Sequence, residues 1–307
     1  MEVLSSALKG KKSNFYMVLT LFLIAFIAVF IFGGDLPINS SIEAMVVFGT
    51  TVMPVLLPFS TLILLTNYAI DKTLDSKHTS LYKVLKYIFI ITAGCPTGAK
   101  TAVLLHEQGA PLSPCTRLAI ITSIASPLVI INCVGRLTFN STIFGVVMFL
   151  SQLLSAKITA DLTLNTDEQI PNLKYPKDNL SSALKENLTA VLTSATLTLL
   201  CYTVAKITVD CLPINILRYP LLVGALFGFV ETNYAMKWFS LVISPLSIAL
   251  ANSTLIFGGA PLILQMIIFC RKLKMRTLKV LKIKLFESAL CFILTYFFML
   301  VFFFLAL

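Results

Sequence analysis

Long runs of apolar residues separated by short polar stretches form the main pattern of this chain. A hydrocarbon core about 30 Å thick requires roughly 20 residues of helix, and most of the runs reach that length. The runs are continuous rather than alternating, which favours helices over a transmembrane barrel. The pattern therefore predicts an all-α polytopic membrane protein with about 8–10 transmembrane segments. We expect spans near residues 15–32, 44–70, 87–105, 116–135, 141–160, 187–209, 218–236, 240–270 and 282–305.

The composition supports the membrane class and narrows the partners. Of the 307 residues, 57% are hydrophobic and 12% are charged, whereas a soluble domain carries about 25% charged residues. The net charge of +10 comes from lysines and arginines at the ends of the apolar runs, which is typical of cytoplasmic loops rather than of a nucleic-acid surface. We therefore expect a surrounding lipid bilayer and no nucleic acid. The seven cysteines form no CxxC pair and there are two histidines, so we expect no metal site and no cofactor.

Charged residues at the ends of the runs predict the orientation. Lys9, Lys11 and Lys12 precede the first run, which is too long for a typical signal sequence, so the N-terminus is expected in the cytoplasm. The segment Arg271–Lys284 carries seven basic residues and no acid, which is the strongest cytoplasmic marker in the chain. The segment Asp161–Glu186 carries five acids and three lysines and is expected on the opposite side.

Two short matches at nearly the same offset indicate an internal repeat. LLTNYAI (64–70) recurs as VETNYAM (230–236), at an offset of 166 (232 minus 66) in the numbering. AGCP (93–96) aligns with GGAP (258–261), at an offset of 165 (259 minus 94). We infer a first transmembrane repeat over 1–160, a polar inter-repeat loop over 161–186 and a second repeat over 187–307.

An odd number of spans in the first half would turn the second half over in the membrane. Such an inverted repeat with two discontinuous helices is typical of secondary transporters. The two broken segments can also be interpreted as re-entrant hairpins. That interpretation would place Asp161–Glu186 in the cytoplasm, so we favour broken helices that cross the membrane.

The first break, within ITAGCPTGAK (91–100), has the features of a binding site. Proline lacks an N–H and glycine favours other conformations, so a new half-helix is expected to begin near Pro96 or Thr97. The N-terminus of a helix binds anions, and Lys100 follows about one turn later. In the second break, Gln265 stands at the position of Lys100. We predict a site for a small solute with at least one negative group. The alternative is a pair of simple kinks and a lysine that extends to the interface.

Further polar groups inside the apolar runs are candidates for the same site. Glu231 could couple transport to H⁺ or Na⁺, pair with Lys100, or anchor the chain near the interface. The serines of TSIASPLVIINCVG (122–135) could line the site or only pack helices together. The candidate substrate-binding residues are Gly94, Cys95, Pro96, Thr97, Gly98, Lys100, Ser123, Ser126, Asn132, Glu231, Thr232, Asn233, Gly258, Gly259 and Gln265.

The sequence contains no set of residues typical of an enzyme. It has no P-loop, HExxH or GxSxG motif, so we expect a protein that is not an enzyme. An intramembrane enzyme that uses Ser126 or Glu231 is one alternative, and a structural or assembly protein without a polar cavity is another. The sequence leaves open the coupling ion, the transport direction and whether the chain forms a homo-oligomer.

Four blocks also resemble a known family in their order and spacing. They are GCPTGAKTAVLLHEQGAPLS (94–113), TSIASPLVIINCVG (122–135), GFVETNYAMK (228–237) and STLIFGGAPLILQ (253–265). The chain is similar here to the YlbJ-type sporulation integral membrane proteins. These belong to the nucleoside-recognition or Gate-domain group, which is related to concentrative nucleoside transporters and to the membrane gate of ferrous-iron transporters.

The resemblance implies a multi-pass transporter in the cell membrane of a bacterium that forms endospores. Its implied cargo is dipicolinic acid, a dianion moved from the mother cell toward the forespore. A nucleoside or metal-ion permease of the same group is the alternative. Ser123-Ile124 stands where the family tends to have asparagines, and FGGAP (257–261) stands where a GGLS type is more common. Both departures fall in the candidate site and therefore concern the substrate more than the fold.

Overall fold

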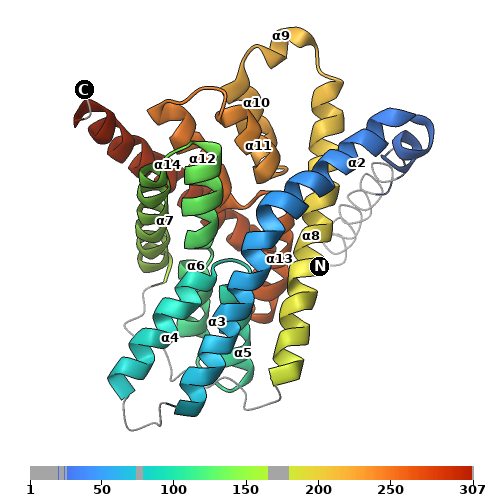
Figure 1. The fold of residues 1–307 in the computed structure, drawn as a ribbon. Helices are drawn as coiled ribbons and strands as arrows, with labels where there is room; N and C mark the ends of the chain where they lie inside the picture. The colour runs from blue at the N-terminus through green and yellow to red at the C-terminus, as the bar shows by residue number, and fades with distance from the viewer. Residues whose placement is uncertain (1–19, 21–23, 25, 74–78, 165–179, 306–307) are drawn as a thin grey trace, which may run out of the picture.

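The computed structural model of the protein describes residues 20, 24, 26–73, 79–164 and 180–305. Within these ranges every regular element is a helix (Figure 1), which confirms the all-α fold. Residues 26–32 are helical, whereas Lys9, Lys11 and Lys12 lie outside the described residues. The elements are α2 (Asp35–Val47), η1 (Phe48–Val52), α3 (Met53–Thr73), α4 (Thr79–Ala93), α5 (Thr97–Glu107), α6 (Leu112–Ile121), η2 (Val129–Thr138), α7 (Thr142–Thr163), α8 (Leu180–Asp210), α9 (Ile214–Leu217), α10 (Pro220–Gly228), α11 (Thr232–Phe239), α12 (Pro245–Phe257), α13 (Gly259–Lys272) and α14 (Thr277–Leu305).

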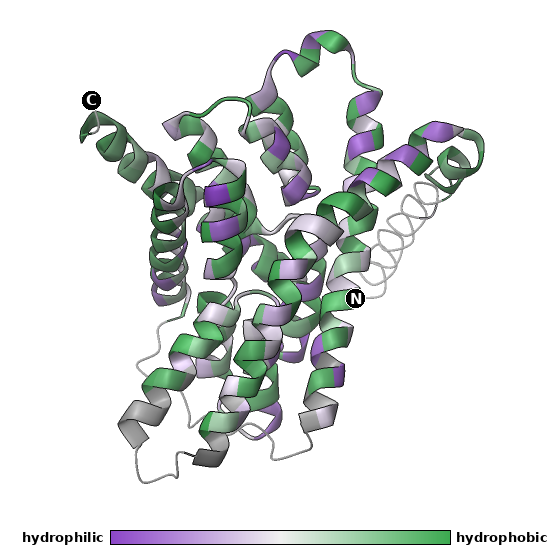
Figure 2. Ribbon diagram, viewed as in Figure 1, coloured by the Kyte–Doolittle hydropathy of each residue, from purple (hydrophilic) through white to green (hydrophobic). Residues whose placement is uncertain are grey.

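Long apolar helices make the protein a multi-pass membrane protein. In the described part of the chain, five stretches are long and apolar enough to cross a membrane. Figure 2 shows hydrophobic residues along most of the length of these helices, and many of their large apolar side chains are exposed, as expected for surfaces in contact with lipid. The five stretches are Asp35–Ile70, Thr142–Thr163, Asn187–Asp210, Pro245–Lys272 and Thr277–Leu305.

The expected span at 87–105 is a re-entrant hairpin. Its arms are α4 and α5, joined by the tip residues 94–96. Ile90 on the first arm belongs to the same buried cluster as Ala99 and Val103 on the second. Because the arms pack together, α4 begins and α5 ends at the same end of the molecule, the lower end in Figure 1.

The expected span at 218–236 is a second hairpin, formed by α10 and α11 around the tip residues 229–231. Gly224 on one arm faces the ring of Phe239 on the other, and a Cβ at Gly224 would lie 2.7 Å from that ring. This hairpin lies at the upper end in Figure 1. The structure therefore differs from the broken crossing helix expected at 87–105 and from the single span expected at 218–236. Hydropathy cannot separate the two, because a crossing helix and a buried hairpin are equally apolar.

Two other segments are interrupted helices. The first consists of α6 and η2, separated by residues 122–128. It runs antiparallel to α7, because Ala125 N donates to Gln152 Oε1 (3.1 Å) and, farther along, Ile131 packs against Gly145. The second consists of α12 and α13, which meet at a left-handed Gly258 (φ 92°) and lie beside α14.

Ion pairs at the lower end show which helix ends lie together. Glu107 at the end of α5 pairs with Lys272 at the end of α13 (3.2 Å), and Arg117 of α6 contacts Asp161 of α7. The polar segment Asp161–Glu186 therefore begins on the same side as the basic segment after Lys272. The expectation that they lie on opposite sides is wrong, because the hairpins do not cross and acids contribute little to orientation.

The two halves of the fold are related by inversion. The α2–α3 stretch lies antiparallel to α8: Tyr202 OH donates to Glu43 Oε1 (3.0 Å) near one end, and Asn187 Nδ2 donates to Ser60 Oγ (3.1 Å) toward the other. Each half then continues with a hairpin, an interrupted helix and a long helix. Between the two halves, α7 ends at Thr163 and α8 begins at Leu180, and the expected repeat boundaries stay a prediction.

The offset between equivalent elements differs from the one that the sequence matches indicate. The second arm of the first hairpin begins at Thr97 and that of the second hairpin at Thr232, an offset of 135 (232 minus 97). The long helices α7 and α14 begin at Thr142 and Thr277, again an offset of 135 (277 minus 142). The two sequence matches do not join elements of the same kind: Thr66 lies inside α3, whereas Thr232 begins a helix after a hairpin tip. Lys100 and Gln265 are therefore not equivalent.

Candidate functional site

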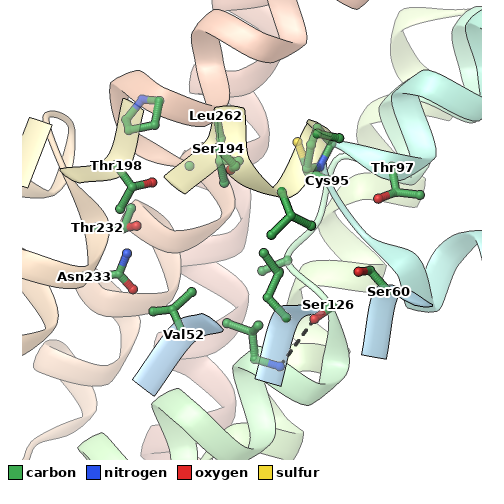
Figure 3. Close-up of a pocket in the computed structure, with 18 of the residues that line it drawn as sticks. Val52, Ser60, Cys95, Thr97, Ser126, Ser194, Thr198, Thr232, Asn233 and Leu262 are labelled. Carbon is green, nitrogen blue, oxygen red and sulfur yellow. Dashed lines mark hydrogen bonds between the residues drawn. The ribbon is translucent and has the colours of Figure 1, made fainter. Parts of the chain in front are cut away.

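A cavity with apolar walls and several polar side chains lies where the two hairpin tips meet the two helix interruptions (Figure 3). Its volume is about 110 Å³, and one ordered water needs roughly 10–15 Å³ on this measure, so several waters or a small solute fit. Residues of η1, α3 and α8 form the remaining walls. Its polar lining residues are Ser60, Cys95, Thr97, Ser126, Asn187, Ser194, Thr198, Glu231, Thr232 and Asn233.

The first hairpin tip is held against the interruption between α6 and η2. Cys95 N donates to the carbonyl of Ile124 (2.7 Å). Gly94 has a left-handed backbone (φ 67°), and a Cβ there would lie 2.7 Å from Ser126 N. Glycine is needed here both for its conformation and for the close approach. The break predicted from glycine and proline is thus present, and it brings two backbones into contact.

The second hairpin tip is held in the same way against the interruption between α12 and α13. Ala260 N donates to the carbonyl of Val230 (3.1 Å). Gly259 also has a left-handed backbone (φ 60°), and a Cβ there would lie 3.2 Å from that carbonyl oxygen. Each tip therefore satisfies a backbone group that an interrupted helix leaves open inside the membrane.

Glu231 is the charged residue that lines the cavity in the described part of the chain. It is 1% exposed and caps α11: Oε2 accepts from Tyr234 N (2.6 Å) and Oε1 accepts from Asn233 Nδ2 (2.8 Å). A carboxylate at a helix N-terminus is stabilised by the unpaired N–H groups of the first turn. The helix end therefore holds this carboxylate, and the lone pairs that remain can face a solute.

Helix α8 forms one wall of the cavity, but the sequence predicts none of its residues for the site. Asn187, Val191, Ser194 and Thr198 line the cavity, and their spacing of three or four positions places them on one face of a helix. This stripe of small polar residues is visible in the sequence. The sequence does not reveal its role, because the same pattern is typical of helix packing in membranes.

The structure brings part of the predicted site together. The predicted residues that line the cavity are Cys95, Pro96, Thr97, Ser126, Glu231, Thr232, Asn233 and Gly258. The other predicted glycines, Gly94, Gly98 and Gly259, are not in the lining and instead allow close packing. At Gly98, for example, a Cβ would lie 2.2 Å from Thr122.

The remaining predicted residues, Lys100, Ser123, Asn132 and Gln265, also lie outside the cavity lining. Lys100 is half-buried on α5. Gln265 is 5% exposed on α13, and its Oε1 has no hydrogen-bond partner among the described residues. Ser123 contacts a buried ion pair on α14, formed by Lys284 and Glu287. Lys100 is therefore not grouped with the residues that line the cavity.

Besides the Lys284–Glu287 pair, a cluster of charged side chains at the upper end connects three helices. Glu43 of α2 pairs with Lys237 of α11 (3.1 Å) and with Lys206 of α8 (3.3 Å), and Lys206 also pairs with Asp210 (2.8 Å). No group of three or more metal-ligating side chains is present within the described ranges.

Searches with known families and proteins do not extend this description. No family model, no curated protein and no solved structure matches the chain. The function of the chain is therefore inferred from its fold and from the geometry of the cavity.

Proposed function

We propose that this chain is a secondary transporter that moves a small organic solute across a bacterial cell membrane. One observation carries the proposal: two hairpin tips and two helix interruptions meet at a cavity whose apolar walls carry several polar side chains. Irregular backbone at membrane depth is tolerated where it is buried in protein or lines a water-filled cavity. Inverted repeats with discontinuous helices around a central site are the architecture of secondary transporters.

The lining favours an uncharged solute with several hydrogen-bonding groups. It offers hydroxyls and amides, apolar walls that include Phe48 and Phe59, and the carboxylate of Glu231. Basic side chains are absent from the lining residues of the described part. A dianion such as dipicolinate would face Glu231 without a counter-charge, whereas a nucleoside would offer it hydroxyl donors.

The orientation of the transporter follows from its basic end. Arg271, Lys272, Lys274 and Arg276 lie at or just beyond the end of α13, at the lower end of the molecule. Basic residues at helix ends are retained in the cytoplasm. We therefore propose that the lower end, with the first hairpin, faces the cytoplasm. A role in sporulation rests on the family resemblance.

Solute uptake into proteoliposomes tests the proposal. Radiolabelled uridine and dipicolinate are compared for the wild type, Glu231→Gln and Glu107→Gln, the last a carboxylate outside the cavity. We expect uridine uptake by the wild type, a loss of about tenfold in Glu231→Gln, equivalent to about 1.4 kcal/mol, and little change in Glu107→Gln. Uptake of dipicolinate alone would contradict the solute class. No uptake of either by folded protein would contradict the transport function.

A further inference from the structure

A buried ion pair lies behind the first hairpin, outside the cavity. Lys284 and Glu287 are one turn apart on α14, their side chains are 3% and 0% exposed, and Nζ lies 2.6 Å from Oε2. The sequence pattern assigns Lys284 to a cytoplasmic loop. The structure places it inside α14, beside the interruption of α6 and η2.

Ser123 completes the surroundings of the ammonium group. Lys284 Nζ donates to the Ser123 carbonyl (2.9 Å) and contacts its Oγ (3.1 Å). With Glu287, this gives three oxygen partners for the three N–H groups of an ammonium. Ser123 Oγ lies 3.2 Å from each oxygen of Glu287. In the described part of the chain, Oε1 of Glu287 has this one long contact, which leaves it able to accept a proton.

The pair is connected to the hairpin tip through the backbone. Ser123 directly precedes Ile124, whose carbonyl accepts the hydrogen bond of Cys95 N at the tip. The Cβ clearance at Gly94 shows that the tip and the interruption are in direct backbone contact. A change in the position of Ser123 would therefore change how the tip is held.

The other titratable side chains close to the pair come from three elements. The thiols of Cys95 on the hairpin, Cys270 on α13 and Cys291 on α14 interact electrostatically with Lys284 or Glu287. These thiols carry no charge in a buried setting. The balance of charge at this position therefore depends on the ammonium and the carboxylate.

A buried ion pair is stable only while both charges are present. When one member is neutralised, the other is left as an uncompensated buried charge, which is strongly unfavourable. The surroundings must then rearrange or admit water. Here the nearest group that can rearrange is the interruption at Ser123, with the hairpin tip attached to it.

We propose that the Lys284–Glu287 pair binds the coupling proton of the transporter, an inference that rests on the proposed function. A proton from water adds to the Glu287 carboxylate and forms a neutral carboxylic acid, so the net charge of the pair rises from zero to +1. Lys284 then loses its counter-charge, and its ammonium group must be compensated by other acceptors or by water, so Ser123 moves and the hairpin tip is released. Return of the proton to water on the other side restores the carboxylate and the closed tip.

Thiol modification tests the link between protonation and the tip without any transport. The protein is reacted with a maleimide at several pH values, and modification of Cys95, which lines the cavity, is divided by that of exposed Cys211 by peptide mass spectrometry. This ratio removes the common effect of pH on thiol reactivity. We expect it to rise at least about threefold between roughly pH 7.5 and 5.5.

Two variants make this measurement specific. Lys284→Met combined with Glu287→Gln removes both charges with similar volume, which folded proteins tolerate better than a single removal. In this double variant the ratio should not change with pH. Lys282→Met, at an exposed lysine on the same helix, should behave like the wild type. A wild-type ratio that does not change with pH would overturn the proposal.

Uptake under imposed gradients tests the coupling itself. We expect a pH gradient to drive solute accumulation by the wild type and by Lys282→Met, and the double variant to lose at least about tenfold of that accumulation. Accumulation that follows a sodium gradient instead would overturn the assignment of a proton. The absence of any uptake would contradict the proposed transport function. Intact pH-driven uptake by the double variant would contradict only the proposed role of the Lys284–Glu287 pair.

Discussion

Glu231 and Glu287 are both buried carboxylates beside a hairpin tip, yet the protein holds them in opposite ways. Glu231 lines the cavity and is stabilised by N–H groups at the start of α11. Glu287 lies outside the cavity and is stabilised by the full charge of Lys284. A dipole leaves a carboxylate available to a ligand, whereas an ion pair makes it dependent on its partner. The proposed roles follow this difference: solute binding is proposed for the second hairpin and coupling for the pair behind the first.

The largest effect is expected from breaking the ion pair on one side only. Glu287→Gln leaves Lys284 buried without a counter-charge and should lower the stability by about 3–5 kcal/mol. Adding Lys284→Met should recover most of this loss. Chemical denaturation in detergent measures both variants. If the single and double variants are equally stable, the pair is not the dominant interaction of Glu287.

The next largest effect concerns the hairpin tips themselves. Gly94→Ala places a Cβ 2.7 Å from Ser126 N at a positive φ and should lower the stability by about 1–3 kcal/mol. Gly109→Ala is the control, because Gly109 also has a positive φ but nothing lies within 4 Å of its Cβ position. Thermal unfolding compares them. Equal destabilisation would show that conformation alone, and not contact with the interruption, requires glycine at the tip.

A smaller effect is expected from the capping carboxylate. Glu231→Gln keeps an oxygen acceptor for Tyr234 N but removes the negative charge at the helix start, so the stability should fall by about 0.5–1 kcal/mol. This is much less than the loss in Glu287→Gln, although both are buried carboxylates. The two variants are measured side by side. An equal loss of stability in the two variants would contradict the proposal that a helix end holds one carboxylate and an ion pair the other.

The smallest effect is expected at the upper charged cluster. Lys237 pairs with Glu43, but its side chain is 57% exposed, so Lys237→Met should change the stability by about 0–1 kcal/mol. Added salt should reduce even this difference. Denaturation at low and high ionic strength measures it. A loss close to that of Glu287→Gln would show that burial does not separate the two ion pairs.

Parts of the fold and of the site can be predicted because they depend on local chemistry. Apolar runs of about 20 residues require helices in a membrane. Glycine and proline at 94–98 and 258–261 predict helix breaks, and breaks occur in both places. Cys95, Thr97, Ser126 and Glu231 line the cavity, and their role in substrate binding stays a prediction.

Other expectations fail where the answer depends on contacts between distant residues. Four-residue matches indicate a repeat register that the arrangement of the helices contradicts. Lys284 resembles its basic neighbours in the sequence, although its partner Glu287 stands three positions away. An i, i+3 pair is equally typical of an exposed helix surface, so the sequence does not indicate burial. The spacing of Lys100 from a break suggests a place in the site, but spacing does not determine which way a helix faces.

The sequence by itself determined that this protein is helical, lies in a membrane and breaks its helices at defined glycines and prolines, because hydropathy and backbone conformation are local properties. The tertiary structure alone decided which broken segments are hairpins, how the halves are inverted and which charges are buried together. These features depend on long-range packing and on the low polarity of the interior, where a charge is stable only beside the group that compensates it.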